Sequence, residues 1–110
     1  MVTAMLARVT IPAKNTPGVP VPVRIIILHP METGYRFDTN GRTIAKNVIH
    51  TLTCTFHGEQ IFRAEMGSGV AANPSVEFYF VADKSGELVF DWADDVGQRG
   101  RHRAMLNVSA

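Results

Sequence analysis

Apolar and polar residues alternate along several short stretches of the chain, which is the period of a β-strand rather than of a helix. The alternation is clearest over residues 47–56, where three threonines fall on one face. The opposite face, which we expect to meet the core, carries Val48, His50, Leu52, Cys54 and Phe56. This segment therefore predicts a strand with one buried side.

Six further segments read as strands by their alternation or by their content of Val, Ile and Phe. They are residues 4–11, 23–29, 59–66, 75–82, 88–94 and 101–108. Residues 23–29 have few polar positions, so we expect that strand to be buried on both faces or central in its sheet. The inward positions of the last four are Phe62, Ala64, Met66, Val76, Phe78, Phe80, Ala82, Leu88, Phe90, Trp92, His102, Ala104, Leu106 and Val108.

Turn signals separate these segments at short and regular intervals. Residues 12–22 are rich in proline and glycine and are expected to end at Pro22, and His57-Gly58 predicts a tight hairpin turn. About seven short strands with such spacing indicate an all-β fold, an immunoglobulin-like antiparallel β-sandwich, formed by one domain over residues 1–110. A small closed barrel is the alternative.

Residues 29–47 are too long for a routine hairpin loop, and long connections are usually functional or structured themselves. Asn40-Gly41 is a strong signal for a two-residue turn, so we expect a short β-excursion with residues 34–37 and 42–45 on its two sides. Its expected outward apolar residues are Met31, Tyr35, Phe37 and Ile44.

Charge and cysteine content exclude several classes of function. The formal net charge is +1 and charged residues make up 19% of the chain, so nothing calls for nucleic acid or an anionic membrane as a partner. The basic residues within 98–103 are interpreted as a solvated turn and strand face. We expect no signal peptide and no membrane span. One cysteine cannot build a disulfide framework.

The histidines and carboxylates do not form a recognisable metal or catalytic motif. No pair has the spacing of a zinc site, and His50 and Cys54 are about 13 Å apart by strand rise alone. Asp94-Asp95 is expected to form local hydrogen bonds in a turn. We therefore expect no metal, no cofactor and no enzymatic activity, which favours a binding module.

Cys54 is the one candidate nucleophile, and its predicted position is on the core face between Leu52 and Phe56. Burial in apolar surroundings raises the pKa of a thiol and lowers its reactivity. A thiol-based redox carrier that uses Cys54 stays open as an alternative. Another alternative is a self-associating immunoglobulin-like module that forms a homodimer through an exposed strand edge.

Four stretches resemble the SoxZ family, whose members are subunits of the SoxYZ sulfur-compound carrier. They are HPMETG at 29–34, GYRFDTNGRTI at 34–44, the segment at 50–74 that ends in Asn-Pro, and VFDWADDVGQRGR at 89–101. HPMETG is fairly specific, whereas the others gain weight from their order over about residues 20–108. The chain departs from the family at IAKNVI, where a proline and a histidine are frequent, and at Met66, where an aromatic is frequent.

The resemblance implies an immunoglobulin-like sandwich and a heterodimer with a SoxY-like carrier protein. SoxY holds sulfur intermediates on a cysteine in a flexible arm during thiosulfate oxidation, and SoxZ supports that arm without catalysis of its own. The resemblance also implies transient contacts with other Sox enzymes. It implies a periplasmic location, reached by export together with a signal-bearing partner. The chain ends without a Gly-Cys-Gly tail, so we do not expect it to be the covalent carrier.

With the resemblance in view, HPMETG and the two aromatic residues after it are interpreted as a docking and bracing loop. Its residues are His29, Pro30, Met31, Glu32, Thr33, Gly34, Tyr35 and Phe37. Pro30 would fix the backbone, Gly34 would permit a positive φ angle and Met31 would offer an adaptable apolar contact. The side chains of His29 and Glu32 would supply orienting hydrogen bonds. Alternatively, the motif closes a corner of the sandwich with Met31 in the core.

Overall fold

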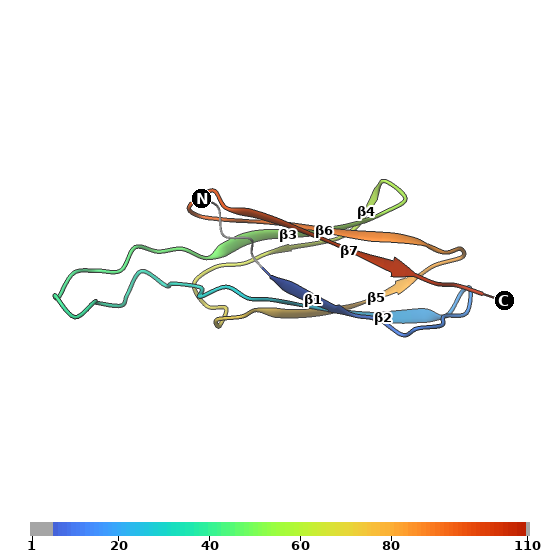
Figure 1. The fold of residues 1–110 in the computed structure, drawn as a ribbon, viewed down its shortest axis with the longest axis horizontal. Helices are drawn as coiled ribbons and strands as arrows, with labels where there is room; N and C mark the ends of the chain where they lie inside the picture. Colours follow the sequence, from blue (N-terminus) through green and yellow to red (C-terminus); the bar gives the residue numbers. More distant parts are fainter. Residues whose placement is uncertain (1–5, 110) are drawn as a thin grey trace.

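A computed structural model describes residues 6–109, which form seven antiparallel strands (Figure 1). Their bounds are β1 Ala7–Thr10, β2 Pro20–Ile27, β3 Ile49–Phe56, β4 Glu59–Glu65, β5 Ser75–Val81, β6 Gly86–Asp94 and β7 Arg99–Leu106. One sheet has the order β1-β2-β5 and the other the order β4-β3-β6-β7. The two sheets face each other, so the predicted all-β sandwich of seven strands is confirmed.

The core lies between the sheets and is built from the alternating inward residues of every long strand. Leu88, Phe90 and Trp92 of β6 are at most 3% exposed. On the open side where β4 faces β5, the rings of Phe62 and Phe78 stack with centroids 4.3 Å apart.

The predicted inward faces of β5 to β7 are confirmed. In β4 the predicted positions also face the core, but Ile61 packs against it as well, because the register against β3 shifts between Cys54 and Thr55. Residues 4 and 5 of the first predicted strand lie outside the described residues.

β2 begins at Pro20, so the prediction that Pro22 ends the preceding turn region is wrong. β1 pairs only with residues 24–27, which leaves residues 20–23 bonded to β5 alone. Proline is tolerated where one side of a strand is unpaired, because no ladder donor is lost there. β2 is central in its sheet, as expected, but its second face is partly exposed rather than buried.

A β-bulge at the start of β3 overturns one predicted core position. The register against β6 shifts between Ile49 and Thr51, so the extra residue reverses the alternation at this point. Ile49 is fully buried beside Val48, whereas His50 is exposed and its Nδ1 lies 2.8 Å from the Thr51 hydroxyl. The turn at the other end of β3 agrees with its prediction, because His57 and Gly58 both have positive φ angles of 50° and 78°.

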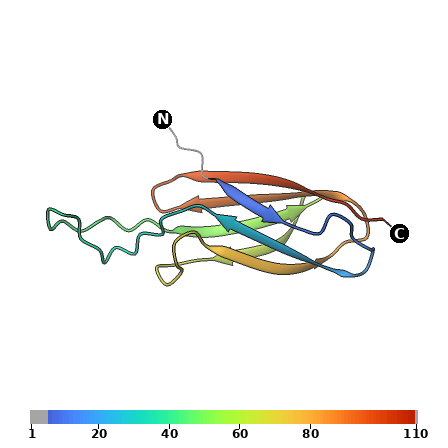
Figure 2. The same ribbon diagram turned by 60° about the horizontal axis from the view of Figure 1, so that its bottom comes forward.

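Residues 32–47, called the hairpin arm below, project from one end of the sandwich (Figure 2). The arm makes the molecule elongated: its radius of gyration is 16.3 Å, against about 13 Å for a compact chain of this length. The predicted β-excursion is confirmed, because Phe37 pairs with Thr43 and the Ile44 amide donates to the Arg36 carbonyl.

The predicted two-residue turn is wrong, because Asp38 pairs with Arg42 around a three-residue loop that ends at Gly41 with φ 76°. The Asp38 carboxylate favours this loop by accepting from the Asn40 and Arg42 amides.

Candidate functional site: a buried histidine corner and its hairpin arm

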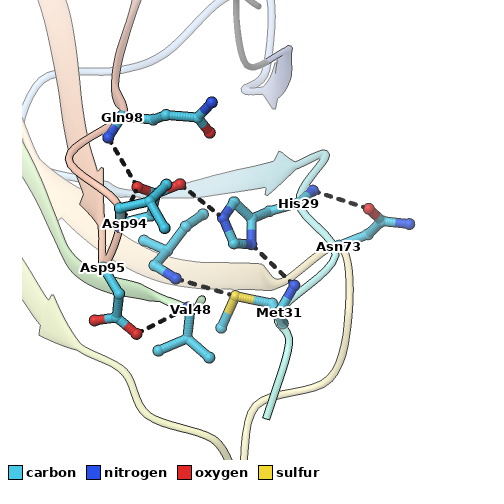
Figure 3. Close-up of polar contacts among 9 residues, drawn as sticks. His29, Met31, Val48, Asn73, Asp94, Asp95 and Gln98 are labelled. Atoms are coloured by element: carbon cyan, nitrogen blue, oxygen red, sulfur yellow. Dashed lines mark hydrogen bonds and ion pairs between the residues drawn. The ribbon is translucent and has the colours of Figure 1, made fainter. Parts of the chain in front are cut away.

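The base of the hairpin arm is fixed by a buried hydrogen bond between the side chains of His29 and Asp94 (Figure 3). His29 follows β2 and Asp94 ends β6, and their side chains are almost completely enclosed. The His29 Nε2 atom lies 3.1 Å from Asp94 Oδ2. The other ring nitrogen, Nδ1, accepts a hydrogen bond of 2.9 Å from the Met31 amide. Because Nδ1 accepts, the proton of the neutral ring belongs on Nε2, where it is donated to Asp94.

Asp94 also holds the turn that joins β6 to β7. Its second carboxylate oxygen, Oδ1, accepts from the amides of Val96 and Gln98 at 3.1 and 2.8 Å. The expectation of local turn hydrogen bonds is thus confirmed for Asp94, but its long-range partner His29 was missed. A usable signal existed: position 94 continues the inward alternation of β6, and a buried carboxylate requires a partner.

Asn73 brings the loop before β5 to the same corner. Its side-chain oxygen accepts from the His29 backbone amide at 3.0 Å, and its backbone amide donates to the His29 carbonyl at 2.8 Å. Ser68 of the same loop donates its hydroxyl to the Thr33 carbonyl at 3.2 Å. The loop before β5 therefore ties the outgoing side of the arm's base to the sandwich by backbone as well as side-chain hydrogen bonds.

Met31 belongs to the core and not to the surface of the arm. It is 4% exposed, and its sulfur accepts a hydrogen bond of 3.3 Å from the Ile49 amide. The expectation that Met31 points outward is wrong, because its positive φ angle of 50° turns the chain at a point that is packed against β3. The alternative interpretation, in which the motif closes a corner of the sandwich, describes His29 and Met31 correctly. Pro30 between them is exposed.

Glu32 and Gly34 shape the first residues of the arm. Glu32 exchanges two backbone hydrogen bonds with Asn47, and its carboxylate meets Arg36 at 2.9 Å. Gly34 has a φ angle of 91°, which confirms the expected positive value. A Cβ atom at Gly34 would lie 3.1 Å from the Cβ of Lys46, so the two sides of the arm approach closely here.

Beyond this base, the arm presents aromatic side chains to solvent. Tyr35 is 82% exposed and Phe37 is 68% exposed. Ile44, on the returning segment of the arm, is half-buried. The Tyr35 amide is held by the Thr33 hydroxyl at 3.1 Å. The structure thus divides the predicted loop into a buried bracing part and an exposed aromatic part, and its docking role stays a prediction.

Cys54 lies apart from this corner, in the middle of β3. Its side chain is fully buried, and burial together with the negative charge of Asp91 raises the pKa of the thiol to about 12. Within residues 6–109, no three His, Cys, Asp or Glu side chains gather closely enough to hold a metal ion. No helix in that range could cross a membrane.

Known structures with the same architecture include two superoxide reductases. The superoxide reductase (neelaredoxin) of Ignicoccus hospitalis is 21% identical, with a TM-score of 0.71 over 94% of this chain and 80% of that protein. The superoxide reductase (neelaredoxin) of Archaeoglobus fulgidus in the reduced form is 20% identical, with a TM-score of 0.63 over 94% of this chain and 89% of that protein. At these identities the likeness shows a shared fold alone.

A comparison with curated proteins finds no match. The family model for sulphur oxidation protein SoxZ matches residues 9–105, which run from within β1 to within β7 and include the histidine corner and the arm. The resemblance noted in the sequence therefore holds over nearly the whole domain. The chain belongs to the SoxZ family of sulphur oxidation proteins.

Proposed function

We propose that the chain is the non-catalytic subunit of a sulfur-carrier heterodimer, in which it supports the cysteine-bearing arm of a SoxY-like protein during thiosulfate oxidation. The observation that carries the proposal is the SoxZ match over residues 9–105. In this role the sandwich is a rigid support, and the sulfur chemistry takes place on the partner. Transient contacts with other Sox enzymes would occur through the assembled pair.

The state of Cys54 supports a role without chemistry of its own. A thiol acts as a nucleophile in its thiolate form, and the raised pKa of Cys54 keeps it protonated at neutral pH. Full burial also denies a substrate access to the sulfur. These two properties favour the supporting subunit over the alternative of a redox carrier that uses Cys54.

The proposal includes a periplasmic location, reached together with a signal-bearing SoxY-like partner. It also allows the isolated chain to form a homodimer, because the edge strands of both sheets present unpaired backbone groups. Such a homodimer would exchange for the heterodimer when the partner is added.

Co-expression with a SoxY-like protein, followed by size-exclusion chromatography with light scattering, tests the proposal. Elution of both proteins together at the mass of a one-to-one complex is the expected result. Separate elution would contradict the proposed function, whether the chain alone is then a monomer or a homodimer.

A further inference from the structure

We infer that the aromatic face of the hairpin arm, formed by Tyr35 and Phe37, docks against an apolar surface bordered by carboxylates on the SoxY-like partner. This inference rests on the proposed function and deepens it, because it assigns the contact surface and the chemistry that the surface requires.

The backbone geometry places the two aromatic residues on one face of the arm. Tyr35 and Phe37 are two positions apart, so their side chains point to the same side of an extended segment. Phe37 pairs with Thr43, and the backbone bonds on either side of that pair put their side chains on the same face. Arg36 lies on the opposite face, where it reaches Glu32. One side of the arm is therefore mainly apolar and the other is charged.

The arm has too few contacts of its own to account for this apolar face. A single two-stranded hairpin is marginally stable in water and normally packs against another element. Here the backbone bonds between its sides are limited to the Glu32–Asn47 pair and to those of Arg36 and Asp38, and the aromatic residues face solvent. Large exposed aromatic residues beside arginine are the composition of interface hot spots.

The charges of the arm indicate what borders the partner surface. Each of the two carboxylates of the arm has a partner through one oxygen: Glu32 Oε1 accepts from Arg36, and Asp38 Oδ1 accepts from two backbone amides. No carboxylate within residues 6–109 pairs with the Arg42 guanidinium, and Lys46 reaches Asp95 only at 4.0 Å. Arg42 and Lys46 thus leave two cationic groups on the returning side of the arm, and carboxylates around the partner's apolar surface complement them.

The test compares the Tyr35→Ser/Phe37→Ser double variant with Tyr79→Ser. Tyr79 is a matched control, because it is 67% exposed on β5 of the sandwich body. Affinity for the SoxY-like protein is measured by titration calorimetry, after circular dichroism and thermal unfolding have shown that each variant is folded. We expect the double variant to lose affinity by about a hundredfold or more and the control to change by less than about threefold.

The possible outcomes distinguish docking through the arm, docking through another surface and self-association through the arm. If the wild-type chain binds and the double variant binds equally well, the arm is not the docking surface and the proposed function stands. If the wild-type chain does not bind the SoxY-like protein, both the docking surface and the proposed function are contradicted. A third outcome is that the wild-type chain alone is a dimer, the double variant is a monomer, and the variant still binds the SoxY-like protein with wild-type affinity. In that case the arm is an interface between two copies of this chain and not the docking surface for the partner.

An Arg42→Glu variant should weaken binding most at low salt. If its affinity equals that of the wild type, the partner surface is not bordered by carboxylates.

Discussion

The His29 ring and the Asp94 carboxylate, 65 positions apart in the sequence, meet at 3.1 Å in the interior of one end of the sandwich. This contact joins the end of β2 in one sheet to the end of β6 in the other. Because only Pro30 and Met31 separate His29 from the hairpin arm, the contact also sets the position from which the arm projects. The corner therefore links the stability of the fold to the presentation of Tyr35 and Phe37.

Asp94→Asn should destabilise the protein by about 2 kcal/mol. Both carboxylate oxygens accept hydrogen bonds, and the asparagine NH2 group would replace one of these acceptors and leave its donor without a partner. Urea unfolding measures the change at constant slope. Asp95→Asn is the matched control: the Asp95 side chain accepts from Val48 through one oxygen, which an asparagine can replace. A loss for Asp94→Asn no larger than that of the control would refute the role of the corner.

Met31→Ala should destabilise the isolated protein by about 2–5 kcal/mol, which is the range for truncation of a buried methionine. Met31 is 4% exposed, whereas Met105 is 56% exposed on β7, so Met105→Ala should have little effect. Thermal unfolding of the two variants distinguishes a core residue from a docking residue. Wild-type stability of Met31→Ala, with weakened partner binding, would mean that Met31 acts at the surface after all.

Gly34→Ala should cost about 1–2 kcal/mol, since an L-residue is strained at a φ angle of 91°. Its Cβ would also press against Lys46 at 3.1 Å. Gly67→Ala serves as the control, because its φ angle is not positive and its Cβ would meet nothing within 4 Å. Chemical unfolding compares the two, and equal stability would show that the arm tolerates the strain.

Stability should fall at alkaline pH through Cys54. Burial raises the pKa of its thiol from 9.0 to about 12, so the folded state keeps a proton that the unfolded state loses. Above pH 9 the unfolded chain binds fewer protons, and the free energy of unfolding therefore decreases as the pH rises. Between about pH 8 and 10 the wild type should lose about 1 kcal/mol more than Cys54→Ala. Parallel losses in the two proteins would contradict this explanation.

Alternation predicted the strands and most of the core because the inward residues of β5, β6 and β7 repeat strictly every second position. It failed at His50, where a bulge adds one residue and leaves no mark in the hydrophobic pattern. It also failed at Pro22, because whether proline fits a strand depends on which neighbour reaches that position.

Only part of the candidate site could be predicted from the sequence. The HPMETG motif, the turn at Gly34 and the exposed aromatic residues are local properties, and local residue types indicated them. The pairing of His29 with Asp94 depends on the sheet topology, which brings the ends of β2 and β6 together. The buried position of Met31 likewise depends on its own positive φ angle, which residue type does not favour.

Hydrogen exchange measured by mass spectrometry, with and without the SoxY-like protein, tests the central claim that this chain supports its partner through the hairpin arm. We expect slower exchange over residues 35–45 in the complex and unchanged exchange around Tyr79 in β5. Formation of a complex in which the arm exchanges as fast as in the free chain would contradict that claim.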